Sequence, residues 1–460
     1  MDKLKTSIPI EPATRQRYIS PTPGEIPIVC WGAFDIERES ELLNGTDDGR
    51  QKHKEFVEKE ISNIVDAHFN AATAITRFET YKFKQQYIAD AGLNIIGGPP
   101  SANHKVYDIT KLVALMNNLF AKCDISQIKA WILGDEPYFD DLDEWETAYS
   151  KSVEEWYPRR RMTYINLNVD RAKYNIGDFY TKEENCQGYM AYLDEMEKRF
   201  HFPVWSYDQY PLVYDKDNNL SVQDSFYENL EIFHRQAKKT NRPFWTFCQC
   251  LQLLTAGKPR TAMPTFARMR YEAFSALAYG SQGITFWSFR EREVPSPDGG
   301  YIDYGEAPVN LNNERTPMWN EVKKTVDLIR KYNDVFLNAK MIIARHTGDR
   351  VWGDLVSYYD YEKDDFGPLM NISTSNLGTS NIGVLLTRLR KGNSYYLVVV
   401  NHSPYAWQNI TLYFDSKVPV YRLDPPNETQ VTPGPDELPT GFPVKLFLAK
   451  GDFMVFRWNK

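Results

Sequence analysis

Two adjacent carboxylates follow an apolar segment that a proline closes. Residues 129–138 read Lys-Ala-Trp-Ile-Leu-Gly-Asp-Glu-Pro-Tyr, so Asp135 and Glu136 stand where a strand should end, with Pro137 blocking its continuation. A turn at a strand end can direct both side chains to one side, and burial of two neighbouring carboxyl groups raises the pKa of one of them. Such a pair can supply a general acid at neutral pH. The alternative is an acidic helix start, because three more aspartates follow closely.

The elements around this pair alternate between short apolar runs and amphipathic helical stretches. The predicted strands cover residues 28–33, 71–76, 93–97, 128–134, 162–168, 204–207, 244–247 and 284–289. Predicted helices between them include residues 53–67, 110–122, 144–156, 184–199, 225–240 and 266–279. This spacing is typical of βα units and predicts an α/β fold, a (βα)8 TIM barrel, with a doubly wound open sheet as the alternative. In a barrel, functional residues lie at the C-terminal ends of the strands.

The pattern changes after residue 340, where alternating strand-like runs and turn residues replace the long helices. We therefore predict an N-terminal extension over residues 1–25, a barrel over 26–340 and a small C-terminal antiparallel β-sandwich over 341–460. The sandwich could be a packing support or a ligand-binding module.

Composition excludes several classes of protein. The chain has 54 Lys and Arg against 61 Asp and Glu, a formal charge of −7, which argues against a nucleic-acid partner. No apolar run is long enough for a membrane span, and the polar residues 1–7 show no secretion signal. Neither the five cysteines nor any other cluster implies a metal or organic cofactor. The oligomeric state does not follow from these patterns.

Several of these features together resemble a known clan. The strand-4 Glu136-Pro137 pair, the run Trp287-Ser288-Phe289 on strand 8 and the trailing sandwich resemble TIM-barrel glycoside hydrolases, in the broad clan of the family 42 β-galactosidases. The resemblance covers roughly residues 25–460. It implies a carbohydrate substrate, Glu136 as general acid/base, and a periplasmic or extracellular location, with a cytoplasmic one also open.

Two positions depart from that clan. The clan places Asn before the strand-4 Glu, whereas this chain has Asp135. Its nucleophile is a Glu ending strand 7, and Gln249 stands about there. A glutamine cannot form a glycosyl ester, so a second carboxylate has to come from elsewhere.

Three interpretations follow. Asp135-Glu136 resembles the acidic pair of the substrate-assisted hexosaminidases of families 20 and 123, in which the Asp holds a 2-acetamido group. Alternatively Asp208 is the second carboxylate, retaining at about 5 Å from Glu136 and inverting at about 6.5–9.5 Å. Otherwise catalysis has been lost and the chain is a non-catalytic carbohydrate-binding barrel. A non-glycosidic barrel enzyme is a further possibility.

Other polar and aromatic residues near strand ends are candidates for substrate binding. With 14% aromatic residues, the chain offers many flat rings that suit sugar faces, although such rings also fill cores. Arg77 could equally form an ion pair, and for Glu291, which stands between Arg290 and Arg292, a surface salt network is the favoured interpretation. The set is Trp31, Arg77, His104, Asn166, Tyr207, Tyr210, Trp245, Gln249, Trp287 and Glu291.

Overall fold

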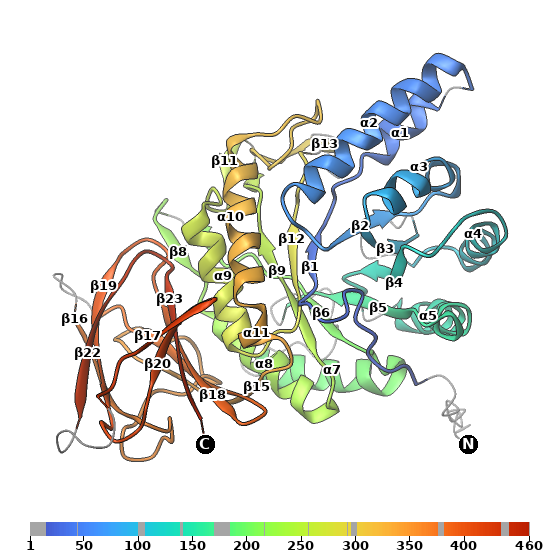
Figure 1. Cartoon of the computed structure of the whole chain (residues 1–460). Coiled ribbons are helices and arrows are strands. Elements are labelled where there is room, and N and C mark those ends of the chain that lie inside the picture. The colour runs from blue at the N-terminus through green and yellow to red at the C-terminus, as the bar shows by residue number, and fades with distance from the viewer. Residues whose placement is uncertain are drawn as a thin grey trace, which may run out of the picture.

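A parallel barrel and a β-sandwich lie side by side in the molecule (Figure 1). The computed structural model describes residues 15–43, 45–99, 106–138, 141–169, 185–215, 217–255, 257–291, 293–295, 301–375, 381–433 and 441–459. Within these ranges, no helix combines the length and the apolar character needed to cross a membrane.

Eight parallel strands close the barrel, in the order β1-β12-β9-β6-β5-β4-β3-β2. Because β1 pairs with both β2 and β12, the sheet has no edge, and the predicted TIM barrel is confirmed over the open-sheet alternative. The strands are β1 (Ile28–Cys30), β2 (Ala71–Ile75), β3 (Asn94–Gly98), β4 (Ile128–Asp135), β5 (Met162–Leu167), β6 (Trp205–Tyr207), β9 (Phe244–Gln249) and β12 (Ile284–Trp287).

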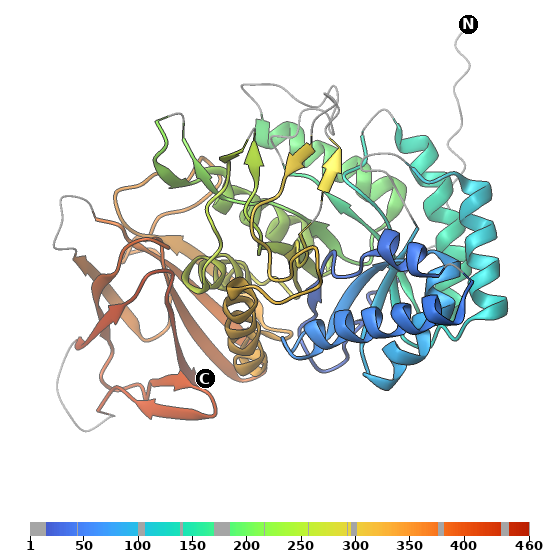
Figure 2. The ribbon, with the colours of Figure 1, turned by 90° about the horizontal axis from the view of Figure 1, so that it is seen from above.

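Helices pack around the barrel, as Figure 2 shows from above. Most of the side chains that they bury are apolar. In α10, the buried residues Met318, Val322 and Ile329 recur at helical spacing. Side chains cap several helix starts, as where the Asp108 carboxylate accepts from the Lys111 amide at 2.9 Å. The helices are α1 (Ile36–Leu42), α2 (Asp47–Val65), α3 (Phe78–Asp90), α4 (Ile109–Lys122), α5 (Leu142–Trp156), α7 (Asn185–Phe200), α8 (Ser225–Thr240), α9 (Phe266–Ala278), α10 (Pro317–Lys331) and α11 (Asn333–Phe336), with a 3-10 turn η3 (Tyr157–Arg159).

Three short hairpins lie at the end of the barrel where the C-terminal ends of its strands meet. They follow β6, β9 and β12, so they extend from the edge at which functional residues of a barrel lie. The hairpins are β7 (Leu212–Tyr214) with β8 (Leu220–Val222), β10 (Leu254–Thr255) with β11 (Lys258–Pro259), and β13 (Glu293–Pro295) with β14 (Tyr301–Asp303).

The C-terminal part is a β-sandwich of a six-stranded and a three-stranded sheet, which confirms the predicted architecture. The first sheet contains β15 (Lys340–His346), β17 (Val384–Lys391), β18 (Ser394–Asn401), β23 (Phe453–Asn459), β20 (Tyr421–Asp424) and β21 (Asn427–Gln430). The second contains β16 (Leu369–Ser375), β19 (Gln408–Phe414) and β22 (Phe442–Leu448). Phe453 stacks on Phe274 of α9 at 3.7 Å between ring centroids, so the larger sheet is packed on the barrel.

Candidate functional site

The chain turns sharply at the end of β4, and the local sequence is fitted to that turn. The pairing of β4 with β5 shifts register between Ile132 and Gly134, an irregularity of the kind that re-aims the side chains after it. A Cβ atom on Gly134 would lie 2.2 Å from the ring of Trp145, so only glycine fits there. Glu136 has a φ of 47°, in the left-handed region that few residues with side chains occupy. This break in the strand frees Glu136 from the alternation that would point it away from Asp135.

Asn166 on β5 connects the polar residues of three neighbouring strands. The register pairs it with Asp135 on β4 and with Ser206 on β6. Its Nδ2 donates to Asp135 Oδ1 at 2.9 Å and to Asp208 Oδ1 at 2.8 Å. Ser206 Oγ donates to Asn166 Oδ1 at 2.7 Å, and the Glu136 backbone amide donates to the Asn166 carbonyl at 2.9 Å. The structure therefore brings together Asp135, Glu136 and Asp208, which we name the carboxylate cluster.

The carboxylate cluster lies at the C-terminal end of the barrel, and each of its members is half-buried. The carboxyl groups of Glu136 and Asp208 are hydrogen-bonded to each other. Burial and the negative charges of Asp208 and Asp135 raise the pKa of Glu136 to about 10. Burial and the charge of Asp135 raise the pKa of Asp208 to about 7, against the lowering effect of the hydrogen bonds from Asn166 and Glu136. At neutral pH the proton of the pair therefore resides on Glu136.

Two stacked rings stand next to the carboxylate cluster. Tyr210 and Trp287 lie 4.8 Å apart between centroids, with their planes 26° apart. Tyr304 meets Trp287 edge-on at 5.8 Å. Burial, and then the charge of Asp208, raise the pKa of Tyr210 well above its usual value, so its hydroxyl stays neutral beside the cluster. Of the predicted aromatic candidates, Tyr210 and Trp287 are the ones that form a flat half-buried surface together.

Three more predicted candidates fall near the barrel rim or outside the described residues. Trp31 follows β1, is half-buried and packs on Phe247 at 5.3 Å. Arg77 precedes α3, with its side chain 40% exposed and 4.0 Å from Glu37. His104 lies in residues 100–105, outside the described residues.

Gln249 is held inside the loop that follows β9. Its Nε2 donates to the Leu251 carbonyl at 2.7 Å and to Thr261 Oγ1 at 2.5 Å. Its backbone amide donates to Glu272 of α9 at 2.9 Å, and the whole residue is buried. The side chain at this position therefore organises the loop.

Three further candidates pack or bond away from the carboxylate cluster. Tyr207 is buried and stacks on Phe233 of α8 at 3.9 Å, in the layer between barrel and helices. Trp245 is buried in the barrel interior, edge-on to Tyr164 at 5.6 Å. Glu291 accepts from the Leu311 amide at 3.3 Å.

Sequence reasoning missed Ser206 and Tyr304. Ser206 shares a strand face with Asp208, since the two residues are two positions apart, and that alternation was a usable signal. Tyr304 follows the hairpin of β13 and β14, and its contact with Trp287 has no local signature in the sequence.

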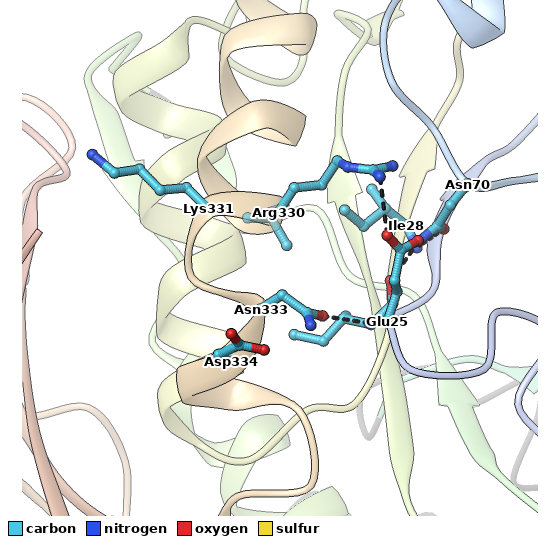
Figure 3. Close-up of a pocket in the computed structure, with 9 residues that line it drawn as sticks. Glu25, Ile28, Asn70, Arg330, Lys331, Asn333 and Asp334 are labelled. Carbon is cyan, nitrogen blue, oxygen red and sulfur yellow. Dashed lines mark hydrogen bonds and ion pairs between the residues drawn. The ribbon is translucent and has the colours of Figure 1, made fainter. Parts of the chain in front are cut away.

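A pocket of about 250 Å³ lies at the opposite end of the barrel, between the start of β1 and the end of α10 (Figure 3). Its polar side chains are used within the chain: Arg330 donates to Glu25 Oε1 at 3.0 Å, and Asn333 Oδ1 accepts from the Ile26 amide at 2.8 Å. These bonds close the barrel bottom. Across the described ranges, no group of three or more His, Cys, Asp or Glu side chains is arranged to hold a metal ion.

Comparisons with known proteins identify the fold. No protein-family model matches the chain, and no curated protein sequence does. Among solved structures, a catalytic mutant of a GH42 beta-galactosidase from G. stearothermophilus matches at a TM-score of 0.57 and 10% identity, covering 96% of this chain and 100% of that one. A beta-galactosidase from Bacillus circulans sp. alkalophilus matches at a TM-score of 0.46 and 10% identity, covering 94% and 99%. The chain thus has the fold of TIM-barrel glycoside hydrolases, as its sequence motifs indicated.

Proposed function

We propose that the protein is an O-glycosidase in which Glu136 is the general acid. The observation that carries this proposal is the hydrogen-bonded pair of Glu136 and Asp208, in which the pKa of Glu136 is raised to about 10. A carboxylic acid that keeps its proton at neutral pH can protonate the oxygen of a leaving sugar. The pair lies at the strand ends where barrel enzymes carry out chemistry.

In the proposed first step, the bond between the anomeric carbon and the glycosidic oxygen breaks as Glu136 gives its proton to that oxygen. The Asp208 carboxylate, released from its hydrogen bond with Glu136, attacks the anomeric carbon and forms an ester. Water activated by the Glu136 carboxylate then cleaves this ester, and Glu136 regains its proton. Every proton and bond is accounted for by the two carboxyl groups and one water molecule.

A second candidate mechanism uses Asp135, which stands beside Glu136 and is held by Asn166 at 2.9 Å. On a substrate with a 2-acetamido group, the acetamido oxygen would attack the anomeric carbon and Asp135 would hold the acetamido N–H. In both routes the group that first attacks the anomeric carbon is not water, and water attacks only in the second step. We therefore propose retention of anomeric configuration.

The test is release of nitrophenol from a panel of aryl glycosides that includes galactosides and both N-acetylhexosaminides. Glu136→Gln should lower turnover by about 10² or more. Glu272→Gln is a matched control, because Glu272 is also buried with its pKa raised, to about 8, but on a helix behind β9. Equal turnover in wild type and Glu136→Gln would overturn the proposal, and sugar binding without any turnover would favour a non-catalytic barrel.

A further inference from the structure

The side-chain amide of Asn166 donates hydrogen bonds to two members of the carboxylate cluster. The group has two N–H donors, and they go to Asp135 at 2.9 Å and to Asp208 at 2.8 Å. Asn166 is fully buried, between β4 and β6, with its own backbone carbonyl tied to the Glu136 amide. No donor of this side chain remains for Glu136. A residue predicted to bind substrate thus has its donors directed at carboxylates.

Ser206 completes the hydrogen bonding of this amide, and the two carboxylates set which way it faces. The Ser206 hydroxyl donates to Asn166 Oδ1 at 2.7 Å, and Ser206 is buried. The reverse orientation of the amide would place its oxygen against two carboxylates and its nitrogen against the Ser206 hydroxyl. The polar ladder across β4, β5 and β6 therefore fixes the amide in the orientation that donates to the aspartates.

We propose that Asn166, held by the hydrogen bond from Ser206, is a positioning residue that assigns the proton of the carboxylate cluster to Glu136. The reason is electrostatic: hydrogen bonds donated to a carboxyl group favour its charged form, and both aspartates receive one. The remaining proton then resides on the third carboxyl group. This inference rests on the proposed function for its catalytic meaning, but the ionisation itself can be measured separately.

Among the residues that the structure describes, three tyrosines interact with the cluster. Tyr164 on β5 faces Asp135, Tyr192 on α7 faces Glu136, and Tyr210 after β6 faces all three carboxylates. Burial raises the pKa of each of these tyrosines, so all three stay neutral through the range in which the carboxyls titrate. Cys250 also interacts with Tyr210, and burial raises its thiol pKa. The amide discriminates among the three carboxyls because its two N–H donors go to the two aspartates.

The experiment compares Asn166→Ala, Ser206→Ala and Ser206→Thr with wild type in the full chain. Asn166→Ala should move the lower limb of the kcat/KM pH profile up by about one pH unit and lower kcat by about 10- to 100-fold with little change in KM. Ser206→Ala should also move the lower limb of the kcat/KM pH profile to higher pH, by less than Asn166→Ala does. Ser206→Thr, which keeps the hydroxyl, should restore the limb toward its wild-type position.

Asn63→Ala is the matched control. Asn63 is also a buried amide, accepting from Arg315 at 2.8 Å and donating to Asn313, and it lies on α2 away from the cluster. Its loss should lower Tm without moving the pH profile. A profile in Asn166→Ala that coincides with wild type, or one that Asn63→Ala shifts equally, would overturn the proposal.

A second readout does not need turnover. Without the donor, the folded-state pKa of Asp208 rises further, so Asn166→Ala should lose more Tm at about pH 9 than at about pH 5. Asn63→Ala should lose the same Tm at both. If wild type proves inactive on every substrate, the proposed function fails while this difference still supports the proton assignment. Equal Tm losses for Asn166→Ala at both pH values would reject it.

Discussion

The carboxyl groups of Glu136 and Asp208 are hydrogen-bonded to each other, although one follows β4 and the other follows β6. A hydrogen bond between the two carboxyl groups leaves no room for the water molecule that inverting glycosidases hold between carboxyls roughly 6.5–9.5 Å apart. The two carboxyl groups share one proton, and this arrangement moves the pKa values of Glu136 and Asp208 apart.

The pH dependence of activity should follow this pair. The active form needs Asp208 ionised and Glu136 protonated, so kcat/KM should fall below about pH 7 and above about pH 10. Asp208→Asn removes a negative charge beside Glu136, so any residual activity should lose its upper limb at a lower pH than wild type. If kcat/KM of the wild type did not fall below about pH 7, the activity would not depend on the ionisation of Asp208.

Stability should fall as pH rises, because both folded-state pKa values are raised. Glu136 has an ordinary pKa of about 4.5 and a folded-state pKa of about 10, so its contribution is fully present below the ordinary value and is lost as pH rises through the folded one. A glutamine at position 136 does not ionise, so Glu136→Gln does not lose stability in this way as pH rises. Its Tm should exceed that of wild type by about 2–4 °C at about pH 9 and match it at about pH 4. Calorimetry at the two pH values would show the opposite order if Glu136 were stabilised as a carboxylate.

The product should form with its anomeric configuration retained. Inversion needs a water molecule between carboxyls about 6.5–9.5 Å apart, and Glu136 and Asp208 are in contact instead. Proton NMR of the fresh reaction mixture, recorded before mutarotation, distinguishes the anomers. An inverted first product would mean that Asp208 moves away from Glu136 when substrate binds.

Placing a carboxylate at position 249, where β9 ends, should not provide a new nucleophile. Gln249 Nε2 donates to the Leu251 carbonyl and to Thr261, and a glutamate cannot make the donation to the carbonyl. Gln249→Glu should therefore cost about 1–3 kcal/mol or more of stability and give no gain in kcat. A variant with full stability and faster turnover would show that this side chain can face the substrate.

The sequence predicted the barrel well because its strands carry a local signal. Every predicted run overlaps a barrel strand, since buried parallel strands read as short apolar segments separated by helices. In the sandwich, strand-like runs over residues 395–400, 409–414, 420–423, 445–448 and 453–458 predict β18, β19, β20, β22 and β23, whereas no such run predicts β15, β16, β17 or β21. The neighbours of β15 and β16 are set by long-range pairing, as in the contact of β15 with β17, which no local pattern encodes.

The site was predictable in part. Asp135, Glu136 and Asp208 follow strand ends, so their convergence followed from closure of the barrel. Tyr207 and Trp245 were candidates because they stand near strand ends, and the structure buries both. Alternation along β6 turns Tyr207 toward Phe233 and leaves Ser206 and Asp208 on the other face. The direction of Gln249 depends on Thr261, twelve residues away, and the sequence carries no sign of that contact.

The central claim is that Glu136 donates the proton to the leaving group, and a leaving-group series tests it most directly. Aryl glycosides of one sugar, with phenols of increasing pKa, would be hydrolysed by wild type and by Glu136→Gln. The account predicts that the mutant loses little on the most acidic phenol and progressively more, to about 10² or beyond, on the least acidic one. A loss that is the same for every phenol, or no loss at all, would contradict it.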